Sequence, residues 1–224
     1  VSVRVPGHPD LFVVKGRGYR ADALPAMRPE DMVVVDMDGV WVDGPKNVVP
    51  CFEVKIHSCI LRDRPDVNSV VHVHPKYSVL LSVLQRQIQP MCQEGAKLVL
   101  DPIPVYQHQK IVTTEAEGAE LAQVLGNSPA AMLFGHGTVT VGSSVEESVT
   151  RILQLEYAAK MNYYALSALG PDYPSISDVL VDEMSGRTPL SELPHFAEPI
   201  RKAAGQPRVG GVWQWYTQQV SADL

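Results

Sequence analysis

The chain lacks several features that would assign it to other classes of protein. No run of about 18 apolar residues occurs, which argues against a membrane-spanning helix. Basic residues are not in excess, because 19 Lys and Arg stand against 25 Asp and Glu, and a nucleic-acid surface usually shows clustered Lys and Arg. Cysteine is scarce: Cys51, Cys59 and Cys92 form no metal-type motif and indicate reduced thiols in a cytoplasmic protein. Small-molecule chemistry is favoured.

The composition is that of an ordinary globular domain, with 45% hydrophobic and 20% charged residues over 224 positions. Because the sequence shows no repeat, low-complexity tract or linker, we predict a single domain over residues 1–224. Its C-terminal tail, from about residue 186, is proline-rich and carries Trp213, Trp215 and Tyr216. For these aromatics, packing against a neighbouring subunit and packing within the chain both stay open.

Hydrophobic periodicity predicts a mixture of strands and helices. Strands are expected at 11–14, 32–36, 70–74 and 130–134, and helices at 52–61, 77–84, 114–125, 145–169 and 176–184. Between the first two strands, Lys15-Gly16-Arg17-Gly18 reads as a turn with two cations and two glycines. Such a turn could bind an anion, but this segment alone slightly favours an ordinary solvated hairpin or loop with surface charges.

Two histidines one residue apart, His72 and His74, lie in a β-branched run. Successive side chains of a strand alternate between faces, so both imidazoles are expected on one face, within reach of a single metal ion. Neutral imidazoles are good ligands for first-row divalent cations, although one buried and one incidental histidine would give the same pattern. His136 stands between two glycines after a strand, which makes it a plausible third ligand.

Other polar residues are candidates for the same site. Glu53 and His57 are four residues apart on a predicted helix that precedes the His72 strand. Glu53 could act as a ligand or a general acid/base, or it could simply be a surface residue complementing the helix dipole. Tyr106 and His108 lie in a proline-rich loop, where they are either exposed functional groups or plain surface residues.

Three segments together resemble the class II aldolase and adducin family. They are Cys51-Phe-Glu-Val-Lys-Ile-His57, Arg64-Pro-Asp-Val-Asn-Ser-Val-Val-His72-Val-His74-Pro75 and Gly135-His136-Gly137-Thr138. The glutamate, the His-x-His pair and the distal histidine occur in the family's order, and the likeness covers nearly the whole chain.

This resemblance implies an α/β fold, a three-layer α/β/α sandwich with a central, mainly antiparallel sheet. It also implies a C4 homotetramer with active sites between subunits, and one divalent ion per subunit (Zn, Mn, Fe or Co) held by His72, His74 and His136. Glu53 matches the family's acid/base, and Tyr106 matches a tyrosine contributed by the adjacent subunit. The adducin branch has lost such ligands, so their presence here favours an enzyme.

Departures from the family pattern bear on the substrate. Where sugar-phosphate enzymes carry a Ser-Ser pair this chain has Cys51-Phe52, and where they carry a Thr-Pro-Ser-Gly loop it has Lys15-Gly-Arg-Gly18. Phe52 suits a flat ring better than a phosphate, while Lys15 and Arg17 could pair with carboxylates. His57 and His108 are further candidates for substrate contact.

This pattern is similar to the family's decarboxylases of hydroxylated aromatic dicarboxylates, such as a dihydroxyphthalate. The hypothesis is a metal-dependent carbon–carbon lyase of this kind, with Glu53 or Tyr106 handling the proton. Two alternatives remain: an aldolase or epimerase acting on a sugar phosphate or other hydroxyketone, and a non-catalytic, adducin-like interaction module.

Overall fold

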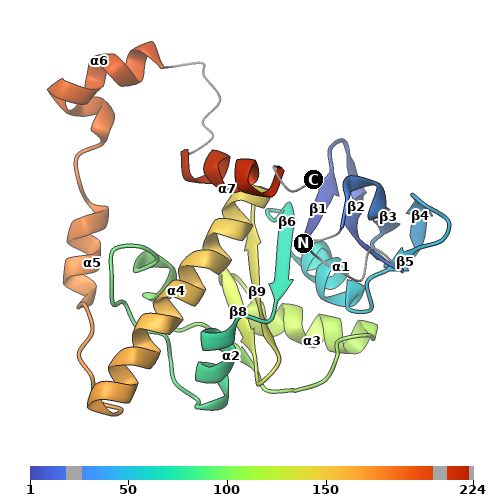
Figure 1. Ribbon diagram of the computed structural model, residues 1–224, viewed down its shortest axis with the longest axis horizontal. Coiled ribbons are helices and arrows are strands. Elements are labelled where there is room, and N and C mark those ends of the chain that lie inside the picture. The colour runs from blue at the N-terminus through green and yellow to red at the C-terminus, as the bar shows by residue number, and fades with distance from the viewer. Residues whose placement is uncertain (19–26, 204–210, 222–224) are drawn as a thin grey trace. The chain divides into compact units, whose positions relative to one another are not determined.

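The computed structural model describes residues 1–18, 27–203 and 211–221. The chain forms two compact units, Val1–Ser175 and Ile176–Leu224. Both are drawn in Figure 1, and each is described by itself. No described helix is long and apolar enough to cross a membrane.

The first unit contains all of the described strands. They are β1 (Ser2–Val5), β2 (His8–Arg17), β3 (Met32–Asp36), β4 (Trp41–Asp43), β5 (Val49–Pro50), β6 (Ser69–Val73), β7 (Val105–Tyr106), β8 (Ala130–Leu133) and β9 (Gly137–Gly142). Its α-helices are α1 (Val54–Asp63), α2 (Lys76–Val83), α3 (Glu115–Leu125) and α4 (Val145–Leu169), and short 3-10 turns lie at Pro29–Asp31 and Lys97–Val99.

The strands form one sheet in the order β4-β3-β2-β1-β6-β9-β8-β7, with β5 paired to β2. Among the described pairs only β7 and β8 run parallel, and the others are antiparallel. Strand β6 lies between β1 and β9, with His72 opposite Val139 and Val73 opposite Thr138. The strand that carries His72 is therefore central and held by ladders on both sides.

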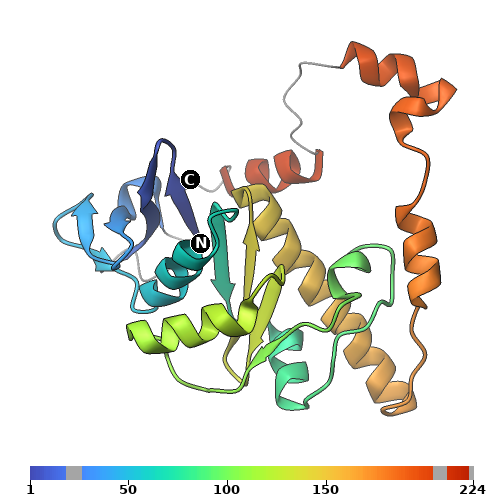
Figure 2. The same ribbon diagram turned by 180° about the vertical axis from the view of Figure 1, so that it is seen from behind.

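Helices cover both faces of this sheet, and each face has its own hydrophobic core. On one face α1 and α3 pack together, burying Ile56, Ile60 and Leu121 against strand residues such as Val70. On the other face α2 and α4 contribute Leu81 and Leu155 beside Met132. Figure 1 shows α4 in front of the sheet, and Figure 2, seen from behind, shows α3 there. The predicted α/β sandwich with a mainly antiparallel sheet is confirmed.

Local sequence explains where several helices begin. The Thr114 hydroxyl accepts a hydrogen bond from the Glu117 amide, and the Glu117 carboxylate accepts one from the Thr114 amide, which makes a capping box before α3. The Ser144 hydroxyl caps α4 in the same manner by accepting from the Glu147 amide. Helix α4 spans Val145–Leu169, as the apolar periodicity predicts.

The predicted turn at Lys15–Gly18 is wrong, because β2 continues through Arg17. Lys15 pairs with Met32 of β3, and Gly16 pairs with Pro50 of β5. A Cβ on Gly16 would lie 2.3 Å from the carbonyl oxygen of Asp31, so the glycine permits close approach of two backbones rather than a turn. Lys15 and Arg17 therefore project from an ordered strand.

The second unit is helical in its described part. It contains α5 (Asp178–Ser185), a 3-10 turn at Leu190–Glu192, α6 (Pro194–Lys202) and α7 (Gly211–Ser221). Pro194 occupies the first turn of α6, where its missing amide hydrogen costs nothing. Trp215 and Tyr216 of α7 are exposed, with ring centroids 5.1 Å apart. Packing of this tail on a neighbouring subunit stays a prediction.

Candidate metal centre

Four side chains from three separated segments meet in one cluster: Glu53, His72, His74 and His136. Glu53 is the residue before α1, His72 and His74 lie at the end of β6, and His136 lies in the turn between β8 and β9. One ligand atom from each lies within 4.8 Å of all the others. These are the four residues that the sequence pattern singles out, and the fold brings them together.

The histidine nitrogens face one another. His72 Nε2 and His74 Nε2 are 3.3 Å apart. Two nitrogens bound tetrahedrally to one ion at zinc-like bond lengths would lie about 3.3 to 3.4 Å apart. Ring centroids of His136 lie 5.2 Å from His72 and 4.8 Å from His74, so the three imidazoles surround a common point. The spacing fits a shared divalent ion.

Glu53 closes the cluster by spanning two of the histidines. Its Oε2 lies 3.3 Å from His72 Nε2, and its Oε1 lies 3.3 Å from His136 Nε2. The amide of Val112 donates a longer hydrogen bond of 3.4 Å to Oε1. Burial pushes the pKa of Glu53 upward, but the hydrogen bond and charge of His72, together with the charge of His136, leave the pKa below its ordinary value. The carboxylate form is thereby favoured.

The protonation pattern of the histidines suits a metal ligand set. The Nδ1 atom of His72 lies 3.3 Å from the carbonyl oxygen of Thr138, and a carbonyl can only accept. In the tautomer that carries its hydrogen on Nδ1, His72 donates to this carbonyl and directs the Nε2 lone pair into the cluster, as a bound cation would require. Burial lowers the pKa of His74, and burial lowers the pKa of His136 more than Glu53 raises it. Neutral imidazoles are the form that binds a cation.

The cluster opens to solvent on one side. The side chains of His72, His136 and Glu53 are 6%, 11% and 19% exposed, whereas His74 is exposed at the surface. Structural metal sites are usually closed, and catalytic sites keep a position for water or substrate. The donor set and its accessibility together indicate a catalytic rather than a structural metal centre.

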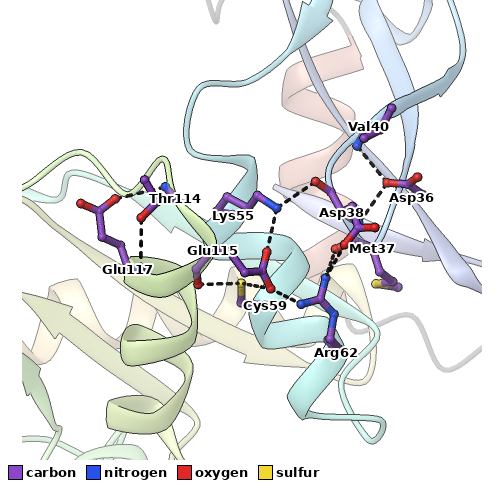
Figure 3. Close-up of polar contacts among 10 residues, drawn as sticks. All are labelled: Asp36, Met37, Asp38, Val40, Lys55, Cys59, Arg62, Thr114, Glu115 and Glu117. Atoms are coloured by element: carbon purple, nitrogen blue, oxygen red, sulfur yellow. Dashed lines mark hydrogen bonds and ion pairs between the residues drawn. The ribbon is translucent and has the colours of Figure 1, made fainter.

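A network of polar contacts holds the helix that follows Glu53 (Figure 3). Lys55 Nζ donates to the carbonyl of Asp38 at 2.9 Å and pairs with Glu115 of α3 at 2.7 Å. Arg62, two turns further along α1, pairs with Asp38 and with the same Glu115. These contacts connect α1 to both α3 and the β3–β4 turn, and so fix the start of α1 beside the histidines.

Other residues predicted for the site have different surroundings. His57 is only 4% exposed, and its Nδ1 is hydrogen bonded to Ser2 Oγ at 2.8 Å, so it offers almost no surface to a substrate. Tyr106 is 2% exposed in the core of its own chain, and its hydroxyl donates to Glu120 Oε2 at 3.1 Å. The expected reach of Tyr106 into a neighbouring subunit's site does not fit this position. His108 is exposed and lies against the Tyr106 ring.

Phe52, the residue before Glu53, is paired with Arg17 of β2. The Arg17 guanidinium carbon lies 3.8 Å from the centre of the Phe52 ring, and Phe52 is 56% exposed. Lys15, two residues before Arg17, donates to the carbonyl of Gly16 at 3.1 Å. An exposed ring with a guanidinium stacked on it is a surface suited to a planar anion.

Sequence reasoning missed the residues that support the ligands. Gly137 packs against the histidines, since a Cβ there would lie 2.7 Å from His72 and 2.8 Å from His74. Thr138 contributes its backbone carbonyl, a role that no side-chain pattern reveals. The Gly-His-Gly spacing was the available signal for Gly137.

Similarity to known proteins identifies the family of this chain. The profile of the Class II Aldolase and Adducin N-terminal domain matches residues 1–163. The chain belongs to this family. As a class II aldolase and adducin family member, it is similar to a 3,4-dihydroxyphthalate decarboxylase of Terrabacter sp. (strain DBF63), 30% identical over 76% of this chain and 73% of that protein.

Two further similarities are to an aldolase and to a solved structure of the aldolase II superfamily. A 5-methylthioribulose-1-phosphate/5-deoxyribulose-1-phosphate aldolase of Rhodospirillum rubrum is 30% identical, covering 73% of this chain and 71% of its own length. The crystal structure of an aldolase II superfamily protein from Pseudomonas syringae superposes with a TM-score of 0.70 at 26% identity, over 90% of this chain and 79% of that one. The resemblance read from the sequence is confirmed.

Proposed function

We propose that the protein is a divalent-metal-dependent carbon–carbon lyase that removes a carboxylate from a hydroxylated aromatic dicarboxylate. The observation that carries the proposal is the convergence of Glu53 and three histidines on one point open to solvent. The likeness to a 3,4-dihydroxyphthalate decarboxylase supports the reaction class. One divalent ion per chain, Zn, Mn, Fe or Co, is expected, because imidazole nitrogens can coordinate all four.

The residues have distinct roles in this proposal. His72, His74 and His136 would hold the ion, which would supply a Lewis acid for the substrate's hydroxyl oxygen. Glu53 takes the proton from that hydroxyl and returns it to the ring carbon that bears the neighbouring carboxylate. The bond between this carbon and the carboxylate then breaks, its electron pair stays with the ring, and carbon dioxide leaves.

Substrate recognition is assigned to Phe52 and Arg17. The exposed Phe52 ring provides a flat apolar surface for the aromatic substrate. Arg17, stacked on that ring, binds the second carboxylate, and Lys15 adds positive charge on the same strand. Exposed His108 is a further candidate for substrate contact. His57 and Tyr106 are buried and have no assigned contact with the substrate.

The test is release of carbon dioxide from a small panel of ortho-hydroxy aromatic dicarboxylates, including 3,4-dihydroxyphthalate, by metal-loaded protein. Wild type is expected to release carbon dioxide, and His72→Ala is expected to lose at least about a hundredfold in rate, the upper end of the effect of disturbing a metal's outer shell. His195→Ala, an exposed histidine of α6, is the matched control and should retain full rate. Equal rates for wild type and His72→Ala would contradict the assignment.

A second candidate is an aldolase or epimerase acting on a sugar phosphate or another hydroxyketone. The observation in its favour is the equal, 30% identity to the Rhodospirillum rubrum sugar-phosphate aldolase. The same preparation is therefore offered phosphorylated ketoses. Cleavage of these, with no release of carbon dioxide from the aromatic acids, would replace the decarboxylase proposal. Absence of both activities together with absence of bound metal would favour an adducin-like interaction module.

We also infer a homotetramer with active sites at subunit interfaces, from the family likeness. Each chain has a mass of 24.6 kDa, so a tetramer would have about four times that mass. Light scattering after size exclusion distinguishes a tetramer from a monomer. A monomer would contradict the inference without affecting the assignment of the metal ligands.

A further inference from the structure

Helix α2 begins directly after the His-x-His segment but lacks a side-chain cap of its own. Its N-cap residue is Pro75, next to His74, and no side chain of the α2 N-cap accepts a hydrogen bond. The first amides of a helix have no partner within the helix, and a Ser, Thr, Asp or Asn at the N-cap normally accepts from the second and third of them. Proline has no side-chain oxygen with which to do so.

The missing acceptor comes from a different helix. Glu156 of α4 accepts a hydrogen bond from the amide of Tyr77 on Oε1 at 2.8 Å, and one from the amide of Ser78 on Oε2 at 3.0 Å. These are the second and third amides of α2, and the negative charge also stabilises the positive end of the helix dipole. Figure 1 shows α2 beside α4, and the two helices pack together.

From this end, α2 reaches the segment around His136 and, through Thr138, the backbone partner of His72. Ser78 Oγ accepts a hydrogen bond from Thr138 Oγ1 at 3.0 Å, and the carbonyl of Thr138 is the partner of His72. One turn later, Ser82 Oγ accepts from the amide of Gly135, the residue before His136. Ser78, Ser82 and Thr138 are at most 1% exposed, so water does not compete for these bonds.

We propose that Glu156 is a positioning residue for the metal centre: by capping α2 it fixes the helix that aligns His72 and His74 with His136. Glu156 touches none of the four clustered residues through a described hydrogen bond or ion pair, and acts through α2. The part of this proposal that concerns metal affinity rests on the proposed metal centre; the part that concerns histidine placement does not.

The experiment compares Glu156→Gln with Glu146→Gln. The glutamine at 156 keeps the size of the side chain, but its amide nitrogen cannot accept, so one of the two helix amides loses its partner and the charge is lost. Glu146→Gln removes the same charge from the first turn of the same helix. In metal-free protein, NMR records the imidazole signals of the seven histidines and amide exchange at Tyr77 and Ser78. A zinc titration against a chelating dye then gives the dissociation constant.

If Glu156 positions the centre, Glu156→Gln moves the signals of His72, His74 and His136, leaves those of His8 and His195 in place, and speeds exchange at Tyr77 and Ser78. The zinc dissociation constant should rise about tenfold, the lower end of the effect of removing an outer partner of a metal ligand. Glu146→Gln should change none of these. Unchanged histidine signals and affinity in a folded Glu156→Gln protein would overturn the proposal. If wild type binds no zinc but the histidine signals of Glu156→Gln still differ from those of wild type, only the proposed function is contradicted.

Discussion

Gly137 leaves no room for a side chain beside the candidate metal centre. A Cβ at this position would lie 2.7 Å from His72 Cε1, 2.8 Å from His74 Cδ2 and 2.8 Å from the carbonyl oxygen of Val73. Carbon atoms at van der Waals contact are separated by about 3.5 Å or more. The glycine is thus required by space, and the histidines are packed against its bare backbone.

We therefore expect Gly137→Ala to displace His72 and His74 without unfolding the chain. Overpacking of this kind costs about 1 to 3 kcal/mol of stability, which a domain of ordinary stability survives. The metal content of purified protein should fall well below that of wild type, while the far-ultraviolet circular dichroism stays the same. Full metal content in Gly137→Ala would show that the imidazoles are not held as the structure indicates.

Tyr106 illustrates a residue whose position differs from the role implied by family resemblance. Its ring lies in the hydrophobic core with Leu133 and Val139, and its hydroxyl donates to Glu120. Burial and the neighbouring Glu120 raise the pKa of Tyr106 to about 12, so the phenol stays protonated at neutral pH. The side chain is thus expected to stabilise the fold rather than to transfer protons.

The test is Tyr106→Phe, which keeps the packed ring and removes only the hydroxyl. Loss of one hydrogen bond should lower the free energy of unfolding by about 1 kcal/mol, measured by urea denaturation. The turnover number should equal that of wild type, since the Tyr106 hydroxyl is bonded to Glu120 and not to a residue of the cluster. A large fall in turnover with unchanged stability would restore the catalytic role.

Among the elements, α1 is held beside the site by polar contacts to two neighbouring segments. The Lys55, Arg62 and Glu115 side chains connect it to α3 and to the β3–β4 turn, as Figure 3 shows. A Cβ on Gly118 of α3 would lie 2.6 Å from Cys59 Sγ, so the two helices approach closely beneath these ion pairs. The polar network and the close packing act together on the helix that follows Glu53.

Glu115→Gln tests this polar network through the pH dependence of the free energy of unfolding. Hydrogen bonds from Lys55 and Arg62 lower the pKa of Glu115 from its usual 4.5, so folding favours the charged form. Its contribution is complete above the unfolded-state pKa and is lost as pH falls through the lower folded-state pKa. Because the pairs are partly exposed, Glu115→Gln should cost about 1 kcal/mol at neutral pH.

The stability difference between Glu115→Gln and wild type should shrink as the pH is lowered below 4.5, since wild type then loses the same charge. Glu94→Gln, which removes a carboxylate from another segment, serves as the control in the same urea titrations. A difference that stays constant with pH would mean that the ion pairs contribute nothing to folding.

Elements with a strong local signal could be predicted from the sequence, and those that depend on distant partners could not. The apolar periodicity of 145–169 and the Thr114–Glu117 capping box predicted α4 and α3. The strand through Lys15 and Arg17 was missed because its pairing partners Met32 and Pro50 lie far along the chain. Two glycines look like a turn locally, whereas tertiary pairing requires an extended strand.

The candidate site also contains residues that the sequence could predict and residues that it could not. Three histidines and Glu53 were found because a metal needs specific side-chain atoms, which leave a readable pattern. The Thr138 carbonyl, the Gly137 backbone and the Glu156 cap were missed, since backbone groups and contacts between helices leave no such pattern. His57 and Tyr106 were proposed for the site by spacing or likeness, and only their burial separates them from it.

For the molecule as a whole, a bound ion would connect segments that are distant in sequence. The cluster joins the start of α1, the end of β6 and the β8–β9 turn. A ligand that binds only the folded state stabilises it by about 2.7 kcal/mol at a hundredfold excess over its dissociation constant. For a chain of this size that corresponds to a rise in Tm of about 5 to 10 °C.

Thermal unfolding of chelator-treated protein, with and without added zinc, measures this effect. We expect the rise in wild type and in His195→Ala, and none in His74→Ala, whose exposed side chain can be truncated without opening the core. An equal rise in His74→Ala would assign the stabilisation to zinc bound elsewhere on the chain.

The most direct test of the account is the number of divalent ions that the four-residue cluster binds. Isothermal titration of metal-free protein with zinc should give one ion per chain for wild type, one for His195→Ala, and none at comparable affinity for His72→Ala or His74→Ala. Binding of one ion with unchanged affinity by both cluster variants would contradict the assignment of Glu53, His72, His74 and His136 as a metal centre. Absence of zinc binding by wild type would contradict it as well.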